Sequence, residues 1–154
     1  MARLSPGDAA PDFALESDDG GTIRLSDLAG TRVVLYFYPK DDTTGCTAQA
    51  CEYRDLNDDF TRVGARVLGV SPDPLALHER FRRKYDLNFT LLSDPDHAAA
   101  EAYGVWVEKS MYGRTYMGVE RSAFVIGPDG VVERALYKVK AKGNAADVLA
   151  GLAG

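Results

Sequence analysis

An uninterrupted apolar run constrains the fold of this chain more than any other feature of the sequence. It is TRVVLYFYP, from Thr31 to Pro39, and its centre, Val33 to Tyr38, consists only of aliphatic and aromatic side chains. A strand of this composition has no face that could lie in water, so it belongs at the centre of a sheet that is covered on both sides. The run is far too short to cross a bilayer. We therefore expect a layered α/β domain built around this strand.

The segments on either side of this run predict a chain in which strands and helices alternate. A helix is expected from about Gly45 to Val63, because apolar residues recur there at three- and four-residue spacing. Two β-rich runs around a Gly-Pro-Asp-Gly turn predict a late hairpin in residues 121–136. The other expected elements are, in chain order, a short hairpin in 12–28, a helical turn capped by Ser26, a strand in 66–70, a helix in 74–86, a strand and turn in 88–96, a short helix in 97–104 and a helix in 144–154.

This order of elements predicts a thioredoxin-like sandwich. The two early strands are joined by a helix, so they should be parallel with a right-handed crossover, and the late hairpin should add antiparallel strands. The predicted fold class is α/β, with a central mixed β-sheet, flanking helices and an N-terminal β-hairpin extension. A chain of 154 residues suits a single domain over residues 1–154.

The composition narrows the class of partner. The chain is 45% hydrophobic and 27% charged, as in ordinary globular proteins. Its formal net charge of -5 does not favour nucleic acid, because phosphate binding usually needs a basic surface. The N-terminal segment contains no apolar stretch of signal-peptide length. We therefore expect a cytoplasmic protein with no membrane and no nucleic-acid partner, in a compartment where thiols stay reduced.

The two cysteines of the chain lie close together, soon after the apolar run. They stand in PKDDTTGCTAQAC as Cys46 and Cys51. Cys46 falls in the first turn of the expected helix, where backbone N–H groups have no helical partner and stabilise a thiolate. The end of a central strand is also where open α/β sheets place their active sites. Both observations make Cys46 a candidate nucleophile.

The five-residue spacing of the cysteines has a geometric consequence. On a regular helix their Cα atoms would lie roughly 8–9 Å apart, whereas a disulfide needs about 4.4–6.8 Å. Cys46 and Cys51 therefore cannot bond while the helix is intact, and a bond between them requires its first turns to unwind. Such a pair suits a cysteine that is oxidised by substrate and then resolved by its neighbour.

Charged residues near Cys46 set a second condition. Asp41 and Asp42 are close in sequence, and a nearby carboxylate disfavours a thiolate. A working nucleophile at this place would need a compensating cation. Spacing alone does not choose among the candidates, which are Lys40, Arg54 and Arg121.

Several of these residues also have purely structural interpretations. A free cysteine is often a small buried hydrophobe, and for Cys51 that interpretation stays open. Thr43 could serve only as a helix cap, and Arg121 could form only a surface ion pair. His78, in an arginine-rich helix, is expected on a solvated face. A zinc site is not expected, because the two histidines are distant in sequence and no second cysteine pair exists.

The segment YFYPKDDTTGCTAQACEYRD resembles the active-site segment of peroxiredoxins, which carries the pattern Pro-x-x-x-Thr-x-x-Cys. In this chain the pattern is Pro39, Thr43 and Cys46. The second cysteine five residues on, with NFTLLSD, YGVW and ERSAFVIGPDG downstream, resembles the bacterioferritin-comigratory protein (peroxiredoxin Q) subgroup. The likeness extends from about Gly7 to the expected C-terminal helix.

This resemblance implies a thioredoxin-dependent thiol peroxidase that reduces hydrogen peroxide and organic hydroperoxides. It makes Cys46 the peroxidatic cysteine, Cys51 the resolving cysteine and Arg121 the active-site arginine, which precedes a late strand in the family. Thr43 would hydrogen-bond the peroxide, and Pro39 would help to exclude water. The implied partners are peroxide substrates and thioredoxin or a similar dithiol reductant. The resemblance also implies a monomer, and it implies no metal, flavin or haem.

Thr44 departs from the commonest form of the motif, in which proline precedes Gly-Cys. Proline would pre-set the backbone at the helix start, whereas threonine could cap the helix through its hydroxyl. We expect the loop to keep its shape and the first helical turn to be less rigid. The change should affect the reaction rate rather than the kind of reaction.

Two other functions fit parts of the pattern. A general thiol–disulfide oxidoreductase would use the same fold, but Cys-x-x-Cys is absent. A redox-sensing or chaperone-like thioredoxin-fold binding module stays open as the alternative. The three functions differ in a simple observation: peroxide consumption driven by reduced thioredoxin, reduction of insulin disulfides, or neither.

Overall fold

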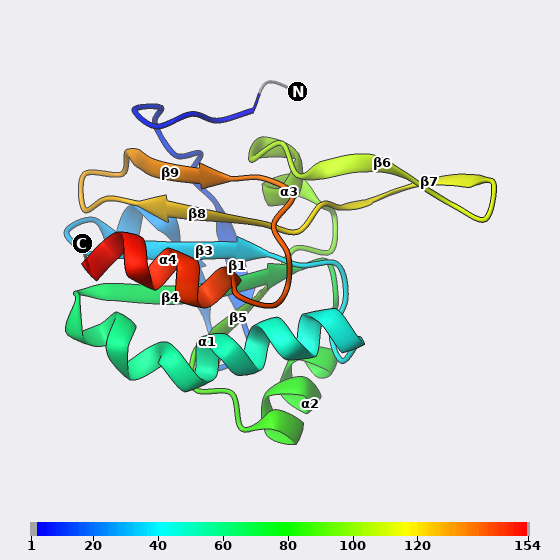
Figure 1. The fold of residues 1–154 in the computed structure, drawn as a ribbon, viewed down its shortest axis with the longest axis horizontal. Helices are drawn as coiled ribbons and strands as arrows, with labels where there is room; N and C mark the ends of the chain where they lie inside the picture. The colour runs from blue at the N-terminus through cyan, green and yellow to red at the C-terminus, as the bar shows by residue number, and fades with distance from the viewer. Residues whose placement is uncertain (1–2, 154) are drawn as a thin grey trace.

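Helices cover both faces of a central sheet in this chain (Figure 1). The computed structural model describes residues 3–153. The strands are β1 Ala14–Ser17, β2 Thr22–Arg24, β3 Arg32–Phe37, β4 Ala65–Ser71, β5 Thr90–Ser93, β6 Trp106–Met111, β7 Arg114–Val119, β8 Ser122–Ile126 and β9 Val132–Leu136. The helices are α1 Thr44–Arg62, α2 Leu75–Tyr85, α3 Ala98–Ala102 and α4 Asn144–Ala153, with a 3-10 turn, η1, at Leu25–Leu28. None of the helices in this described part combines the length and apolar character that a membrane span requires.

A seven-stranded mixed sheet forms the centre, in the order β2-β1-β5-β4-β3-β8-β9. β3 pairs in parallel with β4 and antiparallel with β8, and β4 pairs in parallel with β5. The predicted central strand is β3, and residues 33–37 of it are all buried. The N-terminal hairpin β1–β2 joins the sheet because β1 pairs with β5. The predicted thioredoxin-like sandwich with its hairpin extension is confirmed.

Alternating side chains of β3 contribute to a different core on each face of the sheet. Tyr36, with Tyr38 just beyond the strand, packs with side chains of α1, α2 and α4. Leu35 and Phe37 pack on the opposite face with α3 and the N-terminal segment. Cys46 belongs to the first of these cores. The packing of α1 and α4 against β3 therefore positions the candidate nucleophile.

Ser26 does not cap the predicted helical turn, so that prediction is wrong. It lies inside η1, whose N-cap is Arg24 and whose N-terminus has no side-chain cap bond. The N–H of Ser26 instead donates to Oδ1 of Asp12, at 3.0 Å. A carboxylate from the segment before β1 therefore takes the place of the expected local cap.

A further hairpin, β6–β7, was not expected from the sequence. It forms a two-stranded sheet of its own and projects from the body of the molecule (Figure 1). Its turn residues Tyr112 and Gly113 both have positive φ, of 52° and 77°. Turns of this kind are usually marked by Asn-Gly or Asp-Gly. Tyrosine at the first position removes that signal from the sequence.

Candidate active site

The connection from β3 to α1 places Cys46 beside the end of the central strand. α1 begins at Thr44, one residue before the predicted start, and its N-cap is Thr43. The N–H of Thr47 donates to the carbonyl of Thr43, so the N–H of Cys46 lies ahead of the helical hydrogen-bond ladder. Cys46 is only 2% exposed. Burial by itself disfavours a thiolate, so hydrogen-bond donors and positive charge must compensate for it.

Arg121 supplies that positive charge. Its Nη2 donates to Sγ of Cys46 at 3.2 Å, and its Nη1 donates to Oε1 of Gln49 at 2.5 Å. The planar guanidinium is therefore held at two nitrogens, which fixes its orientation toward the sulfur. Arg121 lies in the short connection between β7 and β8. Of the three cations considered from the sequence, this is the one that contacts Cys46; Lys40 is exposed, and Arg54 bonds elsewhere.

Gln49 connects the arginine to the C-terminal helix. Its Nε2 donates to Oδ1 of Asn144 at 3.0 Å, and the hydroxyl of Tyr53 donates to the same oxygen at 2.7 Å. Gln49, Asn144 and Tyr53 are all buried. Because the amide of Gln49 is bonded at both ends, its carbonyl oxygen stays turned toward Arg121. The network therefore ties α1, α4 and the β7–β8 connection together behind the thiol.

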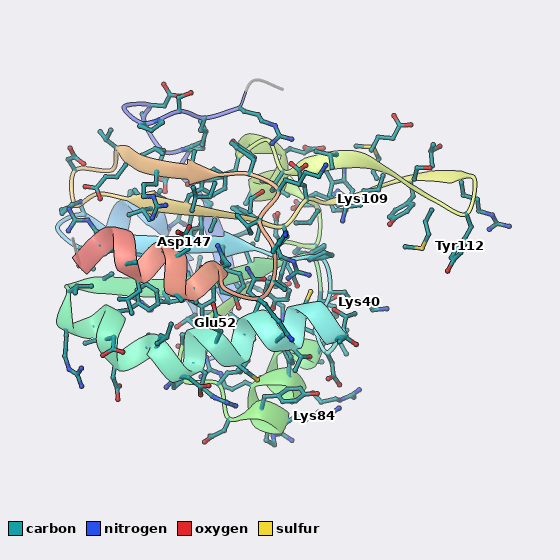
Figure 2. All side chains as sticks on the ribbon, viewed as in Figure 1. Lys40, Glu52, Lys84, Lys109, Tyr112 and Asp147 are labelled. Carbon is teal, nitrogen blue, oxygen red and sulfur yellow. The ribbon has the colours of Figure 1, made fainter. Side chains whose placement is uncertain are left out.

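Gln49 and Asn144 were not predicted from the sequence as site residues. Gln49 stands three positions after Cys46, and residues at this spacing are neighbours on a helix surface, so a signal for it was present. Asn144 carries no such local signal, because only the packing of α4 on α1 brings it to the site. Glu52 strengthens that packing (Figure 2): its carboxylate accepts two backbone N–H groups at the start of α4, at 2.9 and 3.1 Å.

Thr43 and Pro39 lie on the loop that leads into α1. Oγ1 of Thr43 donates to the carbonyl of Lys40 at 3.0 Å, and the hydroxyl forms no cap bond with the helix. Pro39 is half-buried. Thr44 is the first helical residue rather than the cap, so the suggestion that its hydroxyl caps α1 is wrong. The loop thus places Thr43 at the N-terminus of the helix that carries Cys46.

Cys51 is a half-buried free thiol on the same helix. α1 runs without a break from Thr44 to Arg62, so both cysteines lie within one regular helix. The separation of roughly 8–9 Å between their Cα atoms that follows from helix geometry therefore applies. The structure describes a reduced, closed arrangement in which the thiols of Cys46 and Cys51 are held apart.

Asp42 has a cationic partner of its own, away from the thiol. Its carboxylate accepts from Nζ of Lys84 at 2.7 Å and from the hydroxyl of Tyr85 at 2.6 Å, both on α2. The hydrogen bond from Lys84, followed by that from Tyr85, lowers the pKa of Asp42. We expected the Asp42 carboxylate to disfavour the thiolate and Arg121 to offset it. This expectation is corrected, since Lys84 of α2 already balances the charge of Asp42.

Asp41 is likewise paired, and its partner corrects a second expectation. Oδ2 of Asp41 lies 2.6 Å from Nδ1 of His78, and the hydroxyl of Tyr38 donates to Oδ1 of Asp41 at 2.5 Å. His78 is 0% exposed, so its predicted place on a solvated face is wrong. Burial lowers the pKa of His78, but the hydrogen bond and charge of Asp41 outweigh burial and raise it above its ordinary value. Arg82 in the same helix is also not fully solvated, because it donates to Asp18.

A cavity of about 480 Å³ borders Arg121 on the side of the β6–β7 hairpin. Its lining includes Lys109, Tyr116 and Lys138. Lys109 lies on the hairpin (Figure 2) and is half-buried; burial and then the charge of Arg121 lower its pKa. Glu108 and Glu120 also line the cavity, so its charged lining is mixed. The cavity gives a small solute a polar approach to the arginine that contacts Cys46.

Comparison with known proteins gives a consistent set of relatives. A model of the AhpC/TSA family matches residues 6–135. The putative peroxiredoxin bcp of Coxiella burnetii is 47% identical over 149 residues, which cover 97% of this chain and 99% of that protein. PrxQ of Xylella fastidiosa has a TM-score of 0.93 at 36% identity, covering 99% of this chain and 98% of that one. The bacterioferritin comigratory protein of Xanthomonas campestris, whose structures address its alkyl peroxide reduction activity, has a TM-score of 0.87 at 41% identity, covering 92% and 90%.

Proposed function

Because this chain belongs to the AhpC/TSA family and is a thiol peroxidase of the peroxiredoxin Bcp (peroxiredoxin Q) type, we propose that Cys46 is its peroxidatic cysteine and Cys51 its resolving cysteine. The substrates are hydrogen peroxide and organic hydroperoxides. Alkyl peroxide reduction by the Xanthomonas protein supports the second class. The observation that carries the proposal is the 3.2 Å contact between Nη2 of Arg121 and the sulfur of Cys46.

In the first step the thiolate of Cys46 attacks the terminal oxygen of the peroxide. A sulfur–oxygen bond forms, the oxygen–oxygen bond breaks, and the departing alkoxide or hydroxide takes up a proton to leave as alcohol or water. Cys46 becomes a sulfenic acid. Negative charge is spread over the sulfur and both oxygens in the transition state, so fixed donors along that line accelerate the reaction.

The donors for this transition state come from the β7–β8 connection, the first turn of α1 and the loop before it. Arg121 holds the sulfur and can also meet a peroxide oxygen, because its guanidinium presents several N–H groups in one plane. The N–H of Cys46 lies ahead of the helical ladder and is a second donor. The hydroxyl of Thr43 can turn from the carbonyl of Lys40 toward a bound peroxide. Pro39 has no N–H, so it offers no competing donor and helps to keep water out.

In the second step Cys51 resolves the sulfenic acid. Its thiol attacks the sulfur of Cys46, a disulfide forms, and the oxygen leaves as water. Helix geometry keeps the cysteines too far apart for this bond, so residues 44–51 must unwind first. The opening breaks the contacts that Gln49 makes with Arg121 and Asn144.

A dithiol reductant then returns the enzyme to its starting state. Thioredoxin or a similar small protein donates two electrons by thiol–disulfide exchange and becomes a disulfide itself. We place this cycle in the cytoplasm, where such reductants keep thiols reduced. The working unit is a monomer, since both cysteines of the cycle lie on one helix.

A coupled assay tests the proposal. Peroxide consumption driven by reduced thioredoxin is measured for the wild-type protein and for Cys46→Ser, with insulin disulfide reduction as a parallel readout. We expect the wild type to consume peroxide and to leave insulin unreduced, and Cys46→Ser to lose turnover. Retained peroxidase activity in Cys46→Ser would overturn the assignment, and insulin reduction without peroxide consumption would indicate a general oxidoreductase.

A further inference from the structure

The pair formed by Asp41 and His78 joins the loop between β3 and α1, residues 38–43 (the active-site loop), to α2 and has no part in the chemistry proposed above. Nδ1 of His78 lies 2.6 Å from Oδ2 of Asp41, and Nε2 lies 2.9 Å from the carbonyl oxygen of Leu92. The ring belongs to α2, the carbonyl to β5, and the aspartate to the loop between β3 and α1. His78 therefore fastens the loop that precedes Cys46 to two other elements of the fold.

The hydrogen-bond partners of His78 determine how many protons the pair must hold. A backbone carbonyl can only accept, so Nε2 carries a proton. The contact between Nδ1 and Oδ2 of Asp41 then needs a second proton, on either the ring or the carboxyl group. Without that proton, the one proton left on the ring can serve only one of the two contacts. On Nε2 it leaves the lone pair of Nδ1 facing the carboxylate oxygen at 2.6 Å, and on Nδ1 it leaves the lone pair of Nε2 facing the Leu92 carbonyl oxygen at 2.9 Å. The attachment of the loop through His78 to both other elements therefore depends on one titratable proton.

The polar and titratable groups that face the imidazole of His78 come from two loops and from β5. Tyr38 and Asp41 approach from the loop after β3, Asp73 approaches from the loop between β4 and α2, and β5 presents only the Leu92 carbonyl. Asp73 accepts the backbone N–H of Asp41 at 2.6 Å, so it supports the same loop. On α2 itself, the next side chain, Glu79, is exposed, and Arg82 is bonded to Asp18, as described above.

We propose that Asp41 and His78 are positioning residues whose shared proton holds the active-site loop closed, and that loss of this proton frees the loop and the first turn of α1 for the Cys46–Cys51 reaction. This inference rests on the proposed resolving role of Cys51. It makes the opening step dependent on pH through groups that never contact peroxide.

The direction of this dependence follows from the environment of the histidine. Asp41 raises the pKa of His78 above its ordinary value of 6.5. The pair therefore stabilises the closed loop fully below that ordinary value, and the stabilisation is lost as the pH rises through the raised value. Acidification keeps Cys46 in the closed, peroxide-reactive arrangement, and alkaline conditions favour opening.

Asp41→Asn keeps the loop bonded to His78 but removes the need for the titratable proton. The side-chain N–H of asparagine can donate to an unprotonated Nδ1 of His78, and its carbonyl oxygen can accept from Tyr38, so the loop stays attached at every pH. His97→Asn is the matched control: it removes the other histidine, and asparagine tolerates the left-handed φ of 60° at that position. All variants are made in the Cys51→Ser background, so that Cys46 is the only thiol.

The test measures how fast a bulky aromatic disulfide reagent modifies Cys46 from about pH 6 to about pH 9, a range that spans histidine titration. At each pH the rate is first divided by the thiolate fraction of Cys46 in the same variant, which is followed by ultraviolet absorbance, because Asp41→Asn also removes a charge near the thiol. This corrected rate is then divided by that of Asp41→Asn. We expect a ratio near unity at low pH that rises roughly tenfold or more at high pH, as loss of one charge-assisted hydrogen bond predicts. His97→Asn should give the same rise.

A ratio that stays flat across this range would overturn the proposal, as would a rise that is lost in His97→Asn. If Asp41→Asn does not fold, as judged by circular dichroism, His78→Asn replaces it: its amide donates to Asp41 from the place of Nδ1 and does not titrate, so the same rise is expected. Because this assay uses neither peroxide nor Cys51, its result is independent of the proposed function. Failure of that function would appear separately, as a missing Cys46–Cys51 disulfide in mass spectra of the peroxide-treated wild type.

Discussion

The guanidinium of Arg121 contacts the sulfur of Cys46 at 3.2 Å although 75 positions of sequence separate the two residues. The register of the sheet produces this contact. β8 pairs with β3 so that Ser122 lies opposite Phe37. The residue before β8 therefore lies beside the C-terminal end of β3, where the loop to α1 begins. Any change that shifts this register would move the arginine away from the thiol.

Substitution of Arg121 tests what the contact contributes to the reaction. Arg121→Gln should slow the attack on peroxide by about 10²–10³-fold, the usual cost of removing a fixed donor from a transition state. The free energy of unfolding should fall by at most about 1–3 kcal/mol, the cost of leaving the buried Oε1 of Gln49 without its donor. Stopped-flow measurement of the first oxidation step gives the rate, and urea denaturation gives the stability.

Arg134→Gln is the matched control for this prediction. Arg134 lies on β9 and contacts Asp147 at long range, through a partly exposed ion pair at 3.5 Å and a hydrogen bond to its carbonyl oxygen at 3.4 Å. Its substitution should leave the oxidation rate unchanged. An unchanged rate in Arg121→Gln would place that arginine outside the reaction.

Tyr36 and Tyr53 allow a test of the buried polar network by comparison of two stacked rings. Their centroids lie 4.4 Å apart, and both side chains are fully buried. The hydroxyl of Tyr53 donates to Asn144, whereas that of Tyr36 has no partner among residues 3–153. Tyr53→Phe should therefore cost about 0.5–1.5 kcal/mol of unfolding free energy, and Tyr36→Phe should be neutral or stabilising.

Chemical denaturation of the two phenylalanine variants measures this difference directly. Both substitutions remove one oxygen from the same core, so the loss of volume is matched. Equal destabilisation by the two changes would mean that the bond to Asn144 contributes nothing, and that the network does not fix the position of Gln49.

The sequence was sufficient to predict the central architecture because strong local patterns specify it. The run that forms β3 can be buried only on both faces, and the spacing in α1 is helical over five turns. The β6–β7 hairpin was missed because Tyr112 adopts a backbone conformation that usually marks asparagine or glycine. The pairing of β6 with β7 outweighed the low preference of tyrosine for this turn conformation.

The candidate site was only partly predictable, for a different physical reason. Cys46 and Thr43 are specified by their place at the start of a helix, which is a local property. Arg121 was one of three possible cations until the resemblance selected it, because a contact across 75 positions leaves no periodic signal. His78 was placed on a solvated face because nothing local to α2 shows that Asp41 will meet it in the core.

Oxidation should loosen the start of α1, although it adds a covalent bond. In the closed state Cys46 is packed in the core and Gln49 is bonded at both ends. A Cys46–Cys51 disulfide requires these turns to unwind, so their backbone hydrogen bonds are lost. Amide exchange in residues 44–51 should speed up on the order of tenfold or more after one equivalent of peroxide.

The central strands β3 and β4 serve as the internal control for this exchange measurement and should stay protected. Mass spectrometry on the same sample verifies that the disulfide has formed. Equal or slower exchange in residues 44–51 of the verified disulfide form would mean that the cysteines approach each other without unwinding of the helix.

Division of labour between Cys46 and Cys51 is tested most directly by stoichiometric oxidation of the two serine variants. Each variant receives one equivalent of peroxide in the presence of a reagent that traps sulfenic acids, and the modified residue is identified by mass spectrometry. If Cys46 alone meets the peroxide, Cys51→Ser will consume it and carry the trapped sulfenic acid on Cys46, while Cys46→Ser will leave the peroxide intact. Equal loss of the first step in both variants, or a trapped sulfenic acid on Cys51, would contradict the assignment of the two thiols.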